Sequence, residues 1–199
     1  MKYYISLGRQ CNVAYELKKR KHRHFSLPYD WLYIGSFRDI IDMLQYKNSQ
    51  LIDLKNWKII NYKESQYENL KLRNTKSRHF FNKDFTNCYE VQKQIVKRTD
   101  RLFELFHTNN QIEFIRDEQW YSISNSYLED LKDFVSFFEE NYPTLNWSLT
   151  LLLDSNTEDF INKNTKLISD KIKVIFVHSN KDRNWQRQVI PWDYIFLEE

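Results

Sequence analysis

The chain is poor in glycine, proline and alanine: its 199 residues include two glycines, three prolines and the single alanine Ala14. So little glycine and proline excludes collagen-like sequence and a long Gly/Pro-rich linker. No apolar run approaches the roughly 20 residues that cross a bilayer. The apolar stretch near the N-terminus is too short for a signal peptide. We therefore expect a soluble, cytoplasmic protein with no membrane contact.

Cysteine and excess charge are scarce as well. The two cysteines, Cys11 and Cys88, are too few for a disulfide framework and should be free thiols in a reducing compartment. The 30 basic and 27 acidic residues give a net charge of only +3, which argues against a nucleic-acid partner. One basic run, residues 18–24, fits either a solvated helix end or a phosphate contact. Neither metal-ligand spacing nor a glycine-rich phosphate loop occurs, so we expect no metal and no cofactor.

What the chain does have is apolar and aromatic residues, 41% and 17% of the total, enough for a packed core. A mainly disordered chain is therefore excluded. Hydrophobic periodicity predicts helices over residues 11–21, 36–46, 88–108, 128–141 and 159–169. Short β-branched or apolar runs predict strands over residues 3–7, 112–116, 147–154, 172–178 and, at an edge, 194–197.

Strands that alternate with helices predict one α/β domain over residues 1–199. We expect three layers, with a largely parallel sheet and helices on both faces. The runs 149–153 and 174–177 are continuously apolar, which is typical of strands buried on both faces. Residues 47–87 give mixed signals and predict an irregular insert with short elements and a hairpin.

Reactive or charged residues follow each predicted strand. In open α/β sheets ligands lie beyond the carboxyl ends of the strands, so these residues should share one edge. We take six residues as binding candidates: Arg9, Gln10, Asn12, Trp31, Arg116 and Asp154. His178 ends the last strand of the alternating pattern and is a candidate catalytic base.

Cys11 is the candidate nucleophile. It lies at the start of the first predicted helix, where unpaired N–H groups stabilise an anion and lower a thiol pKa. The same N–H groups could hold an oxyanion during acyl transfer, and Gly8 permits the tight exit from the preceding strand. The alternative is that Cys11 is a small apolar residue packed under the sheet.

His79 competes with His178 for the role of base. It lies in a polar and aromatic loop, residues 77–85, and loops of this kind often carry function. A histidine stacked on its aromatic neighbours fits the same composition equally well.

Two stretches carry a resemblance to a known family. Residues 5–17 contain S-L-G-x-x-C-x-x-A-x-x-L, and residues 26–32 contain P-Y-D-W. This chain thereby resembles a family described as papain-like cysteine peptidases, which opens in the same way with P-F-D-W, so that Tyr29 replaces the usual Phe. An aromatic loop before the basic helical stretch 97–102 and the strand 114–116 are also similar to that family.

The resemblance implies a fold and roles for particular residues. It implies Cys11 as nucleophile, a histidine as base, and Asp30 or Asp84 as the group that orients the base. This sequence departs from the family pattern at Lys83, where the family usually has a histidine, and His79 could supply the imidazole instead. A papain-like fold is α+β with an antiparallel sheet, whereas the strand order predicted here is Rossmann-like.

Three functions follow from these features. The first is a cysteine-dependent hydrolase or acyl transferase acting on a peptide, acyl or glycan substrate. The second is a non-catalytic module that binds a sugar or nucleotide, with Cys11 structural, Arg116 holding an anion and aromatic loops 25–33 and 185–192 stacking on the ligand. The third is an inactive interaction domain, which the departure at Lys83 permits. Whichever of these functions holds, Asp30 and Trp31 could instead have structural roles, fixing a turn and filling the core. The sequence does not indicate the oligomeric state.

Overall fold

The structure is a computed structural model that describes residues 1–9, 11–72, 75–82, 84–118, 121–178 and 190–196. It contains a four-stranded parallel sheet in the order β1-β6-β7-β8 and a four-stranded antiparallel sheet in the order β2-β5-β4-β3. The parallel strands are β1 (Lys2–Ser6), β6 (Gln111–Asp117), β7 (Asn146–Asp154) and β8 (Ile172–Val177). The antiparallel strands are β2 (Leu32–Ile34), β3 (Trp57–Asn61), β4 (Gln66–Asn69) and β5 (Thr75–Ser77).

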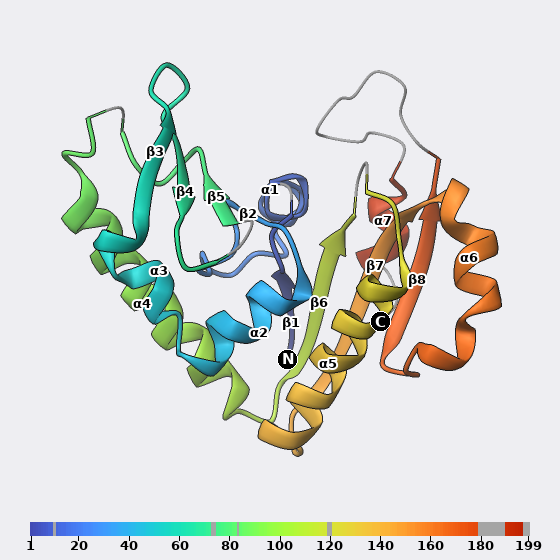
Figure 1. The fold of residues 1–199 in the computed structure, drawn as a ribbon. Helices are drawn as coiled ribbons and strands as arrows, with labels where there is room; N and C mark the ends of the chain where they lie inside the picture. Colours follow the sequence, from blue (N-terminus) through green and yellow to red (C-terminus); the bar gives the residue numbers. More distant parts are fainter. Residues whose placement is uncertain (10, 73–74, 83, 119–120, 179–189, 197–199) are drawn as a thin grey trace.

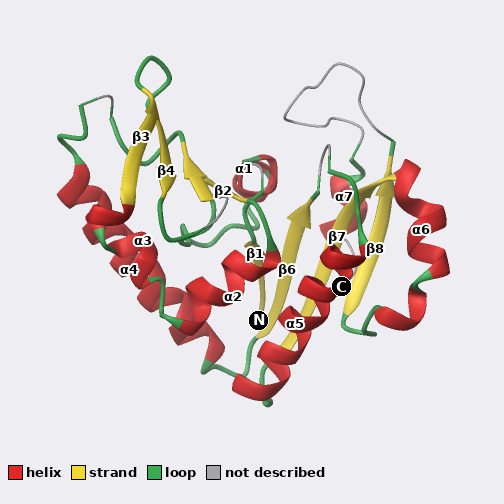
Figure 2. Ribbon diagram, in the orientation of Figure 1, coloured by secondary structure: helices red, strands yellow, loops and turns green. Residues whose placement is uncertain are grey.

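Helices cover both faces of the parallel sheet. On one face, Leu17 of α1 (Asn12–Lys19) and Trp192 of α7 (Trp192–Phe196) share an apolar cluster with Ile115 of β6. The opposite face packs into a larger apolar cluster, to which five further helices contribute: α2 (Phe37–Gln45), α3 (Ser49–Ile52), α4 (Cys88–Phe106), α5 (Asn125–Asn141) and α6 (Glu158–Lys163). The three predicted layers are therefore present, and Figure 2 shows α5 and α6 alongside the parallel strands.

The predicted irregular insert contains most of a second sheet. Strands β3 and β4 form the expected hairpin, and β5 pairs with β4 and with β2. The short helix α3 (Ser49–Ile52) and a 3-10 turn (Leu54–Asn56) precede the hairpin. Figure 1 shows this sheet to the left of the parallel sheet, and the larger apolar cluster runs through both. The molecule thus joins the parallel sheet of the α/β prediction to the antiparallel sheet that the α+β alternative required.

Most predicted helices lie where their apolar periodicity placed them. Ser36 caps α2: its hydroxyl accepts a hydrogen bond from the Asp39 N–H at 3.1 Å. The helix predicted over 159–169 is shorter, because α6 ends at Lys163 and a 3-10 turn (Thr165–Leu167) follows. Among the described elements, no helix is long and apolar enough to cross a membrane.

The edge strand predicted over residues 194–197 is wrong. The described part of that stretch belongs to helix α7, which buries Trp192, Ile195 and Phe196. These three side chains are spaced by three and four residues, so a single turn of helix turns them all toward the sheet. A four-residue apolar run does not by itself separate a strand from a helix.

Candidate functional site

The turn from β1 into α1 requires glycine. Gly8 has a φ of +73°, and a Cβ atom there would lie 2.8 Å from Ile34 Cδ1 and 3.1 Å from the Leu32 carbonyl oxygen. Only glycine adopts this backbone without strain and lets β2 approach so closely. The turn therefore brings β2 against the start of α1, where Cys11 occupies the N-cap position.

The Cys11 side chain is half-buried, and burial raises its pKa from 9.0 to about 11. The nearby positive charge of Arg78 acts in the opposite direction but does not offset the loss of solvation. The expectation that the helix N-terminus lowers this pKa is thus wrong, because removal of water from around the sulfur outweighs it. Cys11 rests as a neutral thiol at neutral pH.

The second sheet brings a histidine to this region. Ser77 of β5 pairs with Leu32 of β2, the strand that packs against Gly8, so Arg78 and His79 follow directly from a strand next to the α1 turn. Burial and the adjacent Arg78 charge lower the His79 pKa below its ordinary 6.5. His79 is therefore a neutral imidazole at neutral pH. Within the described residues, neither its ring nitrogens nor the sulfur of Cys11 takes part in a hydrogen bond.

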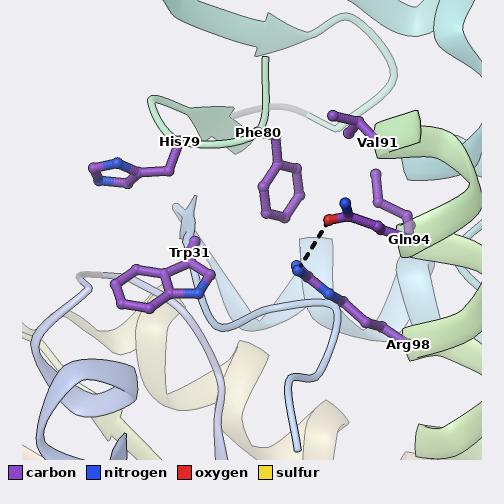
Figure 3. A pocket seen from close by; sticks show the side chains of 7 residues that line it. Trp31, His79, Phe80, Val91, Gln94 and Arg98 are labelled. Atoms are coloured by element: carbon purple, nitrogen blue, oxygen red, sulfur yellow. Dashed lines mark hydrogen bonds between the residues drawn. The ribbon is translucent and has the colours of Figure 1, made fainter. Parts of the chain in front are cut away.

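His79 borders a cavity of about 320 Å³ (Figure 3). The Trp31 indole forms another wall, edge-on to the imidazole with the ring centroids 5.9 Å apart. This contact confirms that His79 packs against an aromatic neighbour while remaining at a cavity. The lining residues are Trp31, His79, Phe80, Val91, Gln94, Ile95 and Arg98.

Neither candidate for orienting the base contacts a histidine among the described residues. The buried Asp30 carboxylate accepts hydrogen bonds from the Leu27 N–H at 3.0 Å and from Arg23 Nη1 at 3.2 Å. Burial raises its pKa from 3.8 to about 6 in spite of these contacts. This is the turn-fixing arrangement that the sequence left open for Asp30. Asp84 is exposed and accepts a hydrogen bond from the Thr86 hydroxyl at 3.2 Å.

Buried charges join the strand ends next to Cys11. The Arg116 guanidinium is fully buried and donates to the carbonyl oxygens of Leu7 and Ile34, each at 2.8 Å, as well as to the Glu118 carboxylate. The second oxygen of Glu118 lies 2.8 Å from Arg9 Nε. We call this the Arg9–Glu118–Arg116 network. It holds the ends of β1, β2 and β6 together in one region of low solvent access.

Arg9 and Asn12, on either side of Cys11, also make contacts within the protein. The Arg9 guanidinium lies over the Tyr121 ring, 3.1 Å from its centroid, and donates to the Gly35 carbonyl oxygen. On the other face of β6, the Asn12 side chain donates to the Asp117 carboxylate. Arg9, Asn12 and Arg116 are therefore near Cys11, as predicted from the strand ends, but their contacts are internal to the protein.

The other two strand ends lie farther away. Asp154 borders a separate cavity of about 500 Å³, together with Tyr121, Asn156 and Phe160. His178 is exposed, with its Nδ1 atom 3.3 Å from the Ser155 hydroxyl. Since β8 is three strands from β1, a spacing of about 4.8 Å per strand puts its end roughly 14 Å away. The shared edge therefore does not bring His178 next to Cys11.

Three residues of this region were not among the candidate site residues taken from the sequence: Arg78, Arg98 and Glu118. Glu118 had a usable signal, because it lies two residues after Arg116 and so shares its side of the extended chain. Gln10 and Lys83, both singled out from the sequence, lie outside the described residues. In the part of the chain that the structure describes, no group of three His, Cys, Asp or Glu side chains could hold a metal ion.

Comparison with known proteins places these residues in a family. The family described as "Putative papain-like cysteine peptidase (DUF1796)" matches residues 2–157. The chain belongs to this family. It is also similar to "Uncharacterized protein R408" of Acanthamoeba polyphaga mimivirus, with 26% identity over 98% of this chain and 97% of that protein. No solved structure gives a significant match.

The matched region of this papain-like peptidase family includes Cys11, Asp30, His79 and Asp84 but not His178. The resemblance noted from the opening motifs is therefore confirmed at the level of the family. Membership supports a general cysteine-hydrolase chemistry, and the roles of individual residues remain predictions.

Proposed function

We propose that this chain is a cysteine-dependent hydrolase of acyl bonds, with Cys11 as the nucleophile and His79 as the general base. The observation that carries the proposal is the position of the Arg78–His79 segment, which follows a strand packed beside the start of α1. The charge of Arg78 acts on the Cys11 thiol, and the next residue is a neutral imidazole. Family membership supports the same class of reaction.

The protonation states define how such a reaction would proceed. A thiol with a pKa of about 11 beside a neutral His79 does not form a resting thiolate–imidazolium pair. Instead, the imidazole would accept the thiol proton as the sulfur attacks the acyl carbon, and the N–H groups at the start of α1 would stabilise the oxyanion. The imidazolium then returns the proton to the leaving group. Water hydrolyses the resulting thioester, with His79 again accepting a proton, and restores the free thiol.

Asp30 and Arg116 act in this proposal through position rather than through chemistry. Asp30 fixes the turn that carries Trp31, and Arg116 holds the β1 exit that leads to Cys11. We further propose that the protein works in the cytoplasm, where a reducing environment keeps Cys11 and Cys88 as thiols.

Acylation by p-nitrophenyl acetate tests the proposal directly. We expect a burst of p-nitrophenol stoichiometric with protein, and mass spectrometry should locate the acetyl group on Cys11. Cys11→Ala should abolish the burst. Cys88→Ala is a matched control, because Cys88 is also a half-buried cysteine at the start of a helix. Equal acetylation of the two cysteines in the folded protein would overturn the assignment.

A second candidate is a sugar-binding module in which Cys11 is structural. The cavity beside Asp154 favours it, because hydroxyl, amide and aromatic groups of Ser122, Asn156 and Phe160 line a space beyond two strand ends. Glycan-array binding that survives Cys11→Ala but is lost in Phe160→Ala would support this function. Absence of binding to the array, together with acetylation of Cys11, would reject it.

A further inference from the structure

The cavity beside His79 contains a cation without an acidic partner. Arg98 extends from α4 into this space (Figure 3). Its Nη2 atom donates to the neutral Gln94 side-chain oxygen at 3.2 Å, and its guanidinium carbon lies 5.7 Å from the centroid of the Phe80 ring. Among the residues described, no carboxylate lies within ion-pair distance of Arg98. Its hydrogen-bonding capacity toward an anion is therefore not used within the protein.

Positive charge also exceeds negative charge around Arg98. Arg23 and Arg101 both act electrostatically on it, whereas among the described residues Asp30 is the one acidic group that does so. The Asp30 carboxylate already accepts a hydrogen bond from Arg23. One carboxylate, already paired with Arg23, thus lies among three guanidinium groups. The excess of positive charge favours an anionic ligand over a neutral or cationic one.

Four of the seven side chains that line the cavity are apolar. Trp31 and Phe80 present aromatic rings, and the buried side chains of Val91 and Ile95 also line the cavity. A volume of about 320 Å³ lies at the lower end of the range of about 300–1,000 Å³ for ligand pockets. The space therefore suits one side-chain-sized group with a hydrocarbon body and a charged tip.

We infer that this cavity is a specificity pocket for a substrate group that has an aromatic or aliphatic body and ends in a carboxylate. The carboxylate would accept hydrogen bonds from Arg98, and the body would lie between Trp31 and Phe80. The other end of the group would then emerge beside His79, where the scissile acyl bond has to be. This inference rests on the proposed function, because it assigns to that hydrolase its preferred acyl group.

Binding of small probes tests the pocket without requiring turnover. We would titrate 3-phenylpropanoate and its neutral amide, 3-phenylpropanamide, into the protein and follow the indole N–H signal of Trp31 by NMR, assigned with Trp31→Phe. The carboxylate should bind at least about tenfold more tightly than the amide, since a hydrogen bond between two charged groups is stronger than one to a neutral group. Inorganic phosphate should bind more weakly than 3-phenylpropanoate, because it has no apolar body to bury.

Variants on one helix supply the controls. Arg98→Gln should reduce the affinity for 3-phenylpropanoate to that for the amide, whereas Arg98→Lys should retain part of the preference. Arg101→Gln is the matched control: Arg101 makes the same kind of aromatic contact, with Phe25, and does not line the pocket. That variant removes only a more distant charge and should therefore weaken binding of 3-phenylpropanoate much less than Arg98→Gln does.

The outcomes separate this inference from the proposed function. Equal binding of 3-phenylpropanoate and its amide would overturn the inference of a carboxylate-specific pocket. So would an Arg98→Gln protein that is folded by circular dichroism and binds 3-phenylpropanoate as tightly as wild type. Phosphate binding as tight as that of 3-phenylpropanoate would also overturn it, because charge alone would then explain the affinity. Cys11→Ala should bind both probes unchanged, so a failure of Cys11 acetylation would leave the binding result intact.

Discussion

Two groups of arginines in this molecule have opposite surroundings. In the Arg9–Glu118–Arg116 network, the fully buried Arg116 donates to two carbonyl oxygens and a carboxylate. In the His79 cavity, the half-buried Arg98 has a neutral amide as its hydrogen-bond partner and an aromatic ring beside it. The comparison separates charges that stabilise the fold, which have their partners within the protein, from charges such as that of Arg98, which are available to bind a ligand.

The largest expected effect comes from breaking the network. Glu118→Gln would leave two buried guanidinium groups without their shared counter-charge. We expect the free energy of unfolding to fall by about 3–5 kcal/mol, the usual cost of removing one partner from a buried ion pair. Urea denaturation followed by circular dichroism measures this change.

An exposed pair provides the matched control for that variant. Arg38 and Asp133 form an ion pair at 3.0 Å with both side chains more than half exposed. Asp133→Asn should therefore cost no more than about 1 kcal/mol. Equal losses in Asp133→Asn and Glu118→Gln would contradict the distinction between network and surface charges.

The carboxylate near Arg98 predicts a dependence of stability on pH. Because burial raises the Asp30 pKa from 3.8 to about 6, the folded protein retains a proton that the unfolded chain has lost between those pH values. The contribution of Asp30 to the free energy of unfolding therefore falls as pH rises from about 4 to 6, by up to about 3 kcal/mol. Wild type should lose stability relative to Asp30→Asn across this window in paired urea titrations. A relative gain with rising pH would show that the Arg23 and Arg98 charges outweigh burial.

Substitution of Gly8, at the turn from β1 into α1, should have a smaller effect on stability. Gly8→Ala would place a Cβ atom 2.8 Å from Ile34 Cδ1 on a backbone with a φ of +73°. We expect a loss of about 1–3 kcal/mol in the free energy of unfolding, since strain at such a position is of that order. Thermal denaturation is the measurement. An unchanged Tm would mean that β2 does not pack against the α1 turn as described.

Much of the fold could be predicted from the sequence because its longer elements have clear periodicity. The strand β7 has four leucines within residues 149–153 and is buried over residues 149–154, and α4 repeats its buried side chains at three and four residues. The antiparallel sheet could not be predicted in the same way. Its strands β2 and β5 have three residues each, too few for an alternating pattern, and the polar β5 sequence Thr75–Ser77 is typical of a loop.

The site was predictable only in part. Cys11, Arg9 and Arg116 could be placed from the ends of strands, because parallel strands bring those ends to one edge. The pairing of Arg9 with Glu118 depends on the fold, since 109 positions separate them in the chain. The raised pKa of Cys11 was missed for a similar reason: the sequence indicates a helix N-terminus but not how much water the neighbouring strand excludes.

The pH dependence of Cys11 acetylation tests the central claim most directly. Stopped-flow measurements with p-nitrophenyl acetate would compare wild type with His79→Ala, and circular dichroism would check that the variant, which loses the ring contact with Trp31, is folded. If neutral His79 accepts the thiol proton, the wild-type rate should rise through a pKa below 6.5 and level off near neutral pH. The His79→Ala rate should instead follow the thiolate, increasing about tenfold per pH unit toward the Cys11 pKa, and be about 10²- to 10⁴-fold slower at pH 7. Identical profiles for the two proteins would contradict the pairing of Cys11 with His79.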